Sequence, residues 1–279
     1  MTTTTKKYKM LVSDLDGTIG NDEHKISEVN KKAMKELVEA GVIFVLCSGR
    51  TPVSLEYVLD QVGIQTDYIV GFNGCSIIDT KTRETLYEQK MDKTNVKDLI
   101  KTISDFDVTI GVYMKDNLVY AQREKGLMDR VDRTSPIHYE IHEDLGSEIK
   151  EDIHKIILVA DRDELDKVYA KMEPIVKDKC GMVFTNTNLL EFIPLNGNKG
   201  IGLKILAERL NIPLSQIVSC GDNYNDIELI ETAGLGIAVA NAVEPLKKVA
   251  DKITKNTNNQ GGFAEIVEFI IKENKGGLN

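Results

Sequence analysis

The sequence predicts an α/β protein in which a parallel-sheet core is interrupted by an inserted α+β domain. Over the first 80 residues, apolar runs alternate with amphipathic helical patterns. Between about residues 75 and 192 this rhythm gives way to short alternating strands, and it returns after Pro194. Regular alternation of strand and helix implies crossover connections, and therefore a parallel sheet with helices on both faces.

The first segment predicts three strands that share the parallel sheet. Each strand candidate is a short apolar run. Ser27 is a suitable N-cap for the first helix, and Gly41 is a suitable residue to end it. The expected strands are residues 9–13, 42–47 and 68–71, and the expected helices are the segment between Ser27 and Gly41 and residues 55–62.

The middle segment predicts a mixed α+β unit. Its strands alternate apolar and polar residues, and Lys115-Asp116-Asn117 is a suitable hairpin turn. The expected strands are residues 109–114, 118–121, 155–159, 181–185 and 189–193, and the expected helices lie around residues 94–104 and 163–177.

After Pro194 the strand and helix alternation resumes. The last helix carries an apolar stripe that includes Phe263, Ile266 and Ile270, which predicts that it packs on the core. The other expected elements are a helix at residues 199–210, a strand at 217–220, a helix after Asn225, a strand at 236–239 and a helix at 244–250.

An inserted domain implies two linkers. A chain of 279 residues has room for about two domains. We expect a discontinuous core of residues 1–78 and 193–279 and an inserted domain of residues 79–192. The linkers near residues 74–82 and 192–197 would form a double hinge, on which the inserted domain opens and closes over the end of the sheet.

The composition argues against several classes of partner. A net charge of −9 and a pI near 5.1 disfavour nucleic acid, because binding to its phosphates depends on clustered Lys and Arg. The first ten residues lack the apolar core of a signal peptide, and the apolar run 42–47 is too short to cross a membrane. We therefore expect a cytoplasmic monomer or homodimer that binds neither nucleic acid nor membrane.

Two patterns that could indicate a metal site have simpler explanations. His138 and His142 have the (i, i+4) spacing of a helical metal site, but the alternating apolar residues between Pro136 and His142 predict an extended segment. The cysteines show no zinc-like spacing, and we expect reduced, mostly buried thiols. They are Cys47, Cys75, Cys180 and Cys220.

Asp14 and Asp16 follow the first predicted strand and are the most informative residues of the chain. If the extended backbone persists through Asp16, both carboxylates point the same way, while Leu15 points elsewhere. Two crowded carboxylates raise a pKa or require a cation, so that one can attack while the other carries a proton. The alternative is an ordinary turn, since Asp-Gly is a common turn pair.

Polar residues also follow the other strands of the predicted sheet. Ligands of open α/β sheets bind outside the carboxyl ends of the strands, so these residues are expected to converge. An acidic protein that binds a phosphate ester also needs local positive charge, from a metal, a lysine or backbone amides at a helix start, and Lys199 opens the helix that follows the insertion. The other segments are Ser48-Gly49-Arg50, Asn73-Gly74 and Gly221-Asp222-Asn223-Tyr224-Asn225-Asp226.

These motifs, in this order, closely resemble those of the haloacid dehalogenase (HAD) superfamily of phosphatases. The closest match is to its Cof-like hydrolases, which carry a large cap inserted between the second and third motifs. The resemblance covers most of the chain and implies a Rossmann-like parallel-sheet core with an inserted α+β cap domain. The matching motifs are Asp14-Leu15-Asp16-Gly17-Thr18, Ser48-Gly49-Arg50, Asn198-Lys199-Gly200, Gly221-Asp222-x-x-Asn225-Asp226, Ala240-Asn241-Ala242 and Gly261-Gly262.

The resemblance implies a role for each acidic residue. Asp14 would be the nucleophile that forms an aspartyl-phosphate, and Asp16 would protonate the leaving group and later deprotonate water. Mg²⁺ would be bound by Asp14, by the backbone carbonyl of Asp16 and by Asp222. Asp226 would lie behind these ligands and hold a metal-bound water or Lys199.

The resemblance also implies a set of groups that bind the transferred phosphoryl group. Fixed donors and positive charge are what phosphoryl transfer chiefly needs. The implied set consists of Ser48, the backbone amides of Leu15 and Gly49, Lys199 and Asn225.

For several of these residues an ordinary structural role stays open. Ser48 could be a helix-start residue and Lys199 a solvated lysine. Asn73 could cap a turn instead of contacting the substrate or the cap, and the role of Arg50 is equally open. The chain also departs from its relatives at Ile19-Gly20-Asn21, where they usually carry leucines, and at Ser48, where many carry threonine. Neither departure removes a catalytic group.

We therefore expect a Mg²⁺-dependent phosphatase that acts on a small phosphorylated metabolite, such as a sugar phosphate, pyridoxal phosphate or FMN. A phosphomutase or phosphotransferase with the same intermediate is one alternative, and a non-enzymatic phosphoester sensor is another. The candidates for selecting the substrate from the cap are Tyr113, Arg123, Lys125 and Arg130.

Overall fold

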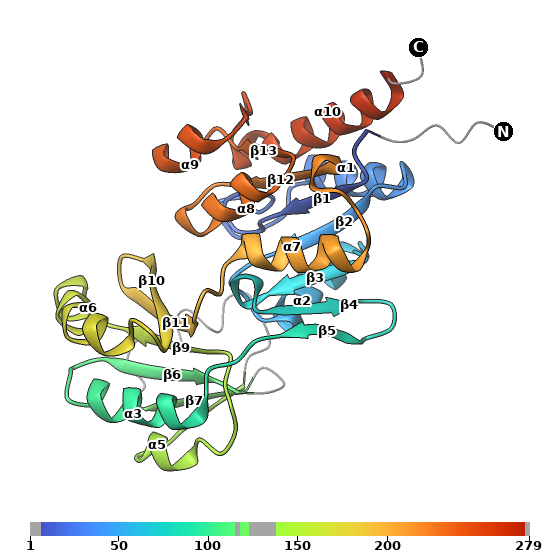
Figure 1. Cartoon of the computed structure of the whole chain (residues 1–279). Coiled ribbons are helices and arrows are strands. Elements are labelled where there is room, and N and C mark those ends of the chain that lie inside the picture. The colour runs from blue at the N-terminus through green and yellow to red at the C-terminus, as the bar shows by residue number, and fades with distance from the viewer. Residues whose placement is uncertain (1–6, 115–117, 123–137, 277–279) are drawn as a thin grey trace. The chain divides into compact units, whose positions relative to one another are not determined.

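The computed structural model describes residues 7–114, 118–122 and 138–276. The chain divides into unit 1, residues 1–87 and 198–279, and unit 2, residues 88–197 (Figure 1). Both boundaries lie beyond those expected from the sequence, 78/79 and 192/193. The first is displaced because residues 76–79, inside the expected linker, and residues 85–88, just after it, form strands that extend the sheet of unit 1.

Unit 1 is built on a sheet that has eight strands among the described residues (Figure 1). The strands are β1 (Met10–Ser13), β2 (Ile43–Cys47), β3 (Tyr68–Gly71), β4 (Ser76–Asp79), β5 (Thr85–Glu88), β12 (Ile217–Gly221), β13 (Leu235–Ala238) and β14 (Lys252–Ile253). Their order is β14-β13-β12-β1-β2-β3-β4-β5. The pairs from β14 to β3 are parallel, and β4 is antiparallel to β3. The chain order reverses at β1, which lies between β2 and β12, and such a reversal is where open sheets bind ligands.

Helices cover both faces of this sheet, which explains why its central strands are mostly apolar. The helices are α1 (Glu28–Glu39), α2 (Pro52–Val62), α7 (Lys199–Arg209), α8 (Ile227–Thr232), α9 (Glu244–Val249) and α10 (Gly262–Gly276). Alternate residues of β1 belong to different cores. Leu11 packs in the cluster that contains Leu37 and Phe263, and Met10 in the cluster that contains Leu203. The predicted parallel-sheet core is therefore confirmed.

Unit 2 is an α+β unit whose described residues form a six-stranded sheet in the order β10-β11-β9-β6-β7-β8. Its pairs are antiparallel except β7 with β8. One core cluster joins its helices to the sheet, with Val96, Leu158 and Leu165 among its members. The elements are β6 (Thr109–Tyr113), β7 (Leu118–Gln122), β8 (His138–Ile141), β9 (Lys155–Val159), β10 (Cys180–Asn186), β11 (Leu189–Pro194), α3 (Lys93–Ile103), α5 (Leu145–Glu148) and α6 (Arg162–Val176).

The helices and strands expected from the sequence are present, with small shifts at their ends. The largest is at α2, which begins at Pro52 because Thr51 is its N-cap and proline suits the first helical turn. The extended segment expected around His138 is β8, so the helical metal site is not formed. The expected turn 115–117 and the candidates Arg123, Lys125 and Arg130 lie outside the described residues. The four cysteines are free and buried, as expected.

The sequence analysis missed β4, which lies within the expected first linker of residues 74–82, and β5, which follows that linker. Ile77 in β4 is buried and pairs with Val70 of β3, so this segment belongs to the sheet. No helix among the described residues combines the length and the apolar character needed to span a membrane.

Candidate active site

Asp14 and Asp16 lie just after the carboxyl end of β1, and their carboxylates have different partners. β1 ends at Ser13, and Gly17 has a positive φ of 82° that turns the chain. Asp14 is buried and binds Lys199, whereas the carboxylate of Asp16 binds Arg50. The turn begins at Gly17, after Asp16, so the expected shared orientation of the two carboxylates stays a prediction.

Lys199 links two carboxylates. Its Nζ lies 2.5 Å from Oδ1 of Asp14 and 2.5 Å from Oδ1 of Asp226. The lysine is 0% exposed and is the first residue of α7, whose N-cap is the Asn198 side chain. The alternative of a solvated lysine is therefore wrong. A buried ammonium needs such partners, because an unpaired charge in the interior is strongly unfavourable.

Asp222 and Asp226 come from the loop that follows β12. Oδ2 of Asp226 accepts hydrogen bonds from the backbone N–H groups of Asp222 and Asn223, each at 3.0 Å. Oδ1 of Asp222 accepts one from the Thr18 hydroxyl at 2.8 Å. Gly221 allows this close fold, since a Cβ there would lie 2.5 Å from the Asp226 side chain. Asp226 therefore anchors both the lysine and the loop.

Asp14, Asp222 and Asp226 form a cluster that could hold a metal ion. One carboxylate oxygen from each lies within 4.8 Å of the others. The three carboxylates outnumber the Lys199 ammonium by two charges, which one divalent cation would balance. Carboxylate oxygens are also the ligands that Mg²⁺ prefers. Because Asp226 already binds Lys199 and two backbone amides, Asp14 and Asp222 are the side chains best placed to bind the ion.

Burial, together with the crowding of these carboxylates, shifts the pKa values of Asp14 and Asp222. Burial, helped by the neighbouring carboxylates of Asp226 and Asp222, raises the pKa of Asp14 well above its usual value, against the opposing effect of Lys199. Burial and the Asp226 charge raise the pKa of Asp222 to about 7. Burial lowers the pKa of Lys199, but Asp14 and Asp226 outweigh it and the net shift is upward. The site is thus short of positive charge.

Asp16 has a different environment. Arg50 donates to both carboxylate oxygens of Asp16, at 2.7 and 2.5 Å, and Nδ1 of His24 lies 3.4 Å from Oδ1. Burial pushes the pKa of Asp16 upward, but the hydrogen bonds from His24 and Arg50 prevail and lower it to about 2. Asp16 is therefore a carboxylate in this state, held by a bidentate arginine.

The expected phosphate-binding groups lie in the same unit. Ser48 is 3% exposed, and the cap of α2 is Thr51, so the helix-start alternative for Ser48 is wrong. Nδ2 of Asn225 donates to Oδ1 of Asn73 at 3.0 Å. The backbone N–H of Asn73 donates to the carbonyl of Ser48 at 2.9 Å. Leu15 is buried after β1, and Gly49 lies against the Asn73 side chain.

Several residues that support this site were not assigned a role from the sequence. Thr18 binds Asp222, and His24 lies beside Asp16. Asn241 donates to the carbonyl of Gly17 at 2.8 Å, and Asn258 to that of Gly20 at 3.1 Å. Thr18 and Asn241 belong to motifs that the sequence analysis quotes, so a role for them at the site could have been predicted from the sequence. His24 and Asn258 contact the segment 16–20 only in the folded chain, and their positions in the sequence do not indicate these contacts.

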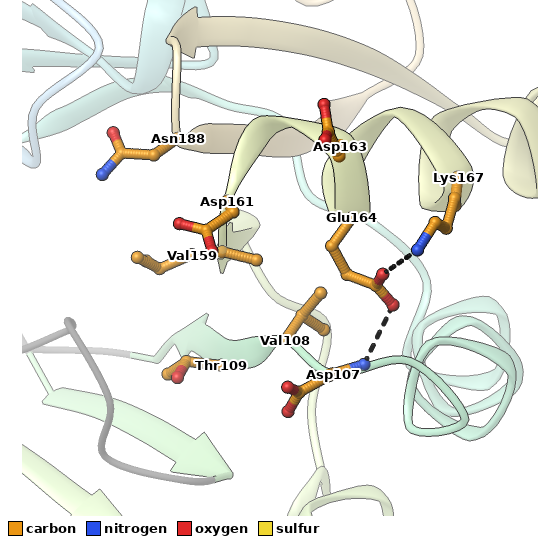
Figure 2. Close-up of a pocket in the computed structure, with 10 residues that line it drawn as sticks. Asp107, Val108, Thr109, Val159, Asp161, Asp163, Glu164, Lys167 and Asn188 are labelled. Carbon is orange, nitrogen blue, oxygen red and sulfur yellow. Dashed lines mark hydrogen bonds and ion pairs between the residues drawn. The ribbon is translucent and has the colours of Figure 1, made fainter.

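Unit 2 contains a cavity of about 460 Å³ (Figure 2). Asp107, Asp161, Asp163 and Glu164 line it, and Glu164 binds Lys167 and the backbone N–H of Asp107. The predicted site residues are not among its lining residues within the described chain. The four carboxylates outnumber Lys167 in the lining, so the charge of this cavity disfavours a phosphate ester.

The comparison with family models supports the resemblance. The model described as haloacid dehalogenase-like hydrolase matches residues 11–267. A protein named putative phosphatase YxeH from Bacillus subtilis is 26% identical, over 95% of this chain and 99% of its own. A protein named HMP-PP phosphatase from Yersinia pseudotuberculosis is also 26% identical, over 86% of this chain and 87% of its own.

Solved structures agree with this similarity. A haloacid dehalogenase-like hydrolase from Bacteroides thetaiotaomicron has a TM-score of 0.87 and 28% identity, over 95% of this chain and 100% of that one. The protein TM0651 from Thermotoga maritima has a TM-score of 0.84 and 29% identity, over 94% of this chain and 97% of its own. The similarity therefore extends over both units.

Proposed function

The chain belongs to the haloacid dehalogenase-like hydrolases, and from this membership we propose that it is a phosphatase that hydrolyses small phosphorylated metabolites through an aspartyl-phosphate. The observation that carries the proposal is the buried contact between Asp14 and Lys199 beside Asp222. A carboxylate, a cation and a pair of metal-ligating oxygens are the groups that phosphoryl transfer needs.

Asp14 is the proposed nucleophile. Lys199 holds one of its oxygens, so the other can face phosphorus. Attack forms a bond from Asp14 to phosphorus and breaks the bond to the leaving alkoxide; water then attacks phosphorus and releases phosphate and the free Asp14. Lys199 also offsets negative charge on the phosphoryl oxygens.

Asp16 is the proposed general acid and base. As a carboxylate it can accept a proton from the attacking water, but it must carry a proton to protonate the leaving alkoxide. The bidentate bond from Arg50 opposes that protonation. We therefore assign the bond between Arg50 and Asp16 to the resting enzyme. When substrate binds, this bond loosens and Asp16 can take up a proton.

The acidic cluster fits Mg²⁺, which Asp14, Asp222 and the backbone carbonyl of Asp16 would hold. When bound, the ion supplies positive charge to the phosphoryl group and to the crowded carboxylates. Asp226 keeps Lys199 and the Asp222 loop in place. Ser48, the amides of Leu15 and Gly49, and Asn225 complete the proposed phosphoryl site.

The proposed substrates are small phosphate esters, such as sugar phosphates, pyridoxal phosphate or FMN. The name of the Yersinia relative, HMP-PP phosphatase, supports a small phosphorylated metabolite. We assign substrate selection to unit 2, as the cap of the HAD resemblance, and Tyr113 remains a candidate for that role.

The test is Asp14→Asn, which keeps the size of the side chain and removes its nucleophilic oxygen. With Mg²⁺ and 4-nitrophenyl phosphate, we expect phosphate release to fall by at least about 10³-fold. Asp60→Asn, at an exposed position of α2, is the matched control and keeps the rate. An Asp14→Asn protein that keeps about a tenth of the wild-type rate would exclude the proposed nucleophile.

A further inference from the structure

The turn that follows β3 has an unusual backbone. Phe72, Asn73 and Gly74 all have a positive φ, of 50°, 53° and 96°. Only glycine adopts this region without steric cost, and other residues held there cluster at functional sites. The N–H of Phe72 donates to the carbonyl of Arg50, and the N–H of Asn73 to the carbonyl of Ser48, each at 2.9 Å. The turn is thus tied to the loop that carries Ser48.

The same turn touches two other segments of the site. A Cβ at Gly49 would lie 3.1 Å from both amide atoms of Asn73, so the Asn73 side chain lies flat against this backbone. A Cβ at Gly74 would lie 3.2 Å from Cα of Lys199. Asn225 is the third partner, through its bond to Asn73. One turn therefore contacts three of the segments that carry proposed phosphate-binding groups.

The Asn73 side chain is not explained by the turn alone. It is 3% exposed, and its Nδ2 has no hydrogen-bond partner among the described residues. A buried, unpaired donor is unfavourable, and a glycine would suit the positive φ without burying one. What the side chain does provide is its Oδ1, which accepts the hydrogen bond from Nδ2 of Asn225 at 3.0 Å.

We propose that Asn73 is a positioning residue that orients the side-chain amide of Asn225 toward the phosphoryl group. An amide has nearly the same shape when it is rotated by half a turn, so a free Asn225 could present either its oxygen or its nitrogen to an anion. The bond to Asn73 fixes one N–H of Asn225 and leaves the second N–H to donate to a phosphoryl oxygen. This inference rests on the proposed function, in which Asn225 binds that group.

The experiment measures the dissociation constant of orthovanadate with Mg²⁺ by calorimetry for the full-length wild type, Asn73→Gly, Asn225→Ala and the double variant. We expect Asn73→Gly to weaken orthovanadate binding by about 10-fold without lowering the melting temperature, because glycine suits the backbone. The double variant should bind like Asn225→Ala alone, because Asn73 acts through Asn225. Loss of kcat/KM for 4-nitrophenyl phosphate should follow the same pattern.

Asn211→Gly is the matched control, because Asn211 has a φ of 52° but is exposed after α7. It should leave orthovanadate binding unchanged. The positioning role is overturned if Asn73→Gly binds orthovanadate like the wild type, or if the effects of the two substitutions add, which would indicate a direct contact of Asn73 with the ligand. An inactive Asp14→Asn together with a normal Asn73→Gly removes this inference only, whereas an active Asp14→Asn removes the proposed function.

Discussion

The ammonium of Lys199 lies 2.5 Å from a carboxylate oxygen of Asp14, although 185 positions separate the two residues in the chain. Asp14 follows the central strand β1, and Lys199 begins α7, the first helix after unit 2. The sheet of unit 1 therefore brings residues from before and after unit 2 into one buried contact. Any change to this contact is expected to affect both stability and turnover, because both groups are removed from water.

Lys199→Met should lower the free energy of unfolding by about 3–5 kcal/mol, because it leaves Asp14 and Asp226 buried without their shared cation. Urea titration measures this loss, and phosphate release should be lost with it. Lys204→Met, at an exposed position of the same helix, is the control. An unfolding free energy within about 0.5 kcal/mol of the wild type would show that the buried pair does not stabilise the fold.

The sequence predicts the positions of site residues that directly follow a strand or begin a helix. The end of a predicted strand or helix determines at which edge of the sheet the next residue lies. Asp14 follows a strand and Lys199 begins a helix, and they meet where the sheet order reverses. Ile77 was assigned to a linker because its strand is short and is followed at once by a polar turn, so that its pairing with β3 has no periodic signal.

Side-chain pairing was harder to predict than position. The sequence leaves open whether Arg50 contacts substrate or cap, and in this structure its guanidinium binds Asp16. An arginine side chain is long and has several rotatable bonds, so its Cα position does not determine its partner. His24 reaches Asp16 through a turn in which its own φ is 58°, which no spacing rule indicates. Contacts of this kind depend on the tertiary fold.

Arg50→Met should raise the pKa of Asp16 from about 2 toward the ordinary value for aspartate. The direction follows because the substitution removes donors that stabilise the charged carboxylate. Carbon-detected NMR titration measures the shift, with Asp16→Asn to assign the resonance. Arg83→Met, which removes an exposed partner of Glu56, should leave the Asp16 titration unchanged. An unshifted Asp16 in Arg50→Met would mean that His24 alone accounts for the low pKa.

Removal of divalent cations with EDTA should stop phosphate release, and Mg²⁺ should restore it. Mg²⁺ should also raise the melting temperature, because it offsets repulsion among Asp14, Asp222 and Asp226. Asp222→Asn should weaken both effects. Since the pKa of Asp222 is about 7, protons compete with the ion below that pH, and Mg²⁺ affinity should rise as the pH is raised through 7. Full activity in excess EDTA would exclude a metal-dependent mechanism.

His154 should make the stability of unit 2 depend on pH. It is buried, its Nε2 lies 2.8 Å from Glu88, and burial lowers its pKa below 6.5 despite the opposing effect of Glu88. The unfolded chain therefore binds this proton at a higher pH than the folded chain does. The stabilisation is complete at a pH above the pKa of His154 in the unfolded chain. It is lost as the pH falls through the pKa of His154 in the folded chain.

Melting temperatures at about pH 7.5 and about pH 5 test this dependence, because these conditions lie on either side of the unfolded pKa. The loss of stability on acidification should be smaller in His154→Gln than in the wild type. His138→Gln, at an exposed position of β8, is the control and should keep the wild-type dependence. Equal losses in the wild type and His154→Gln would show that other groups cause the acid sensitivity. Glu88 is the first residue of unit 2. A smaller loss of stability on acidification in His154→Gln would therefore assign the acid sensitivity to the segment where the chain enters unit 2.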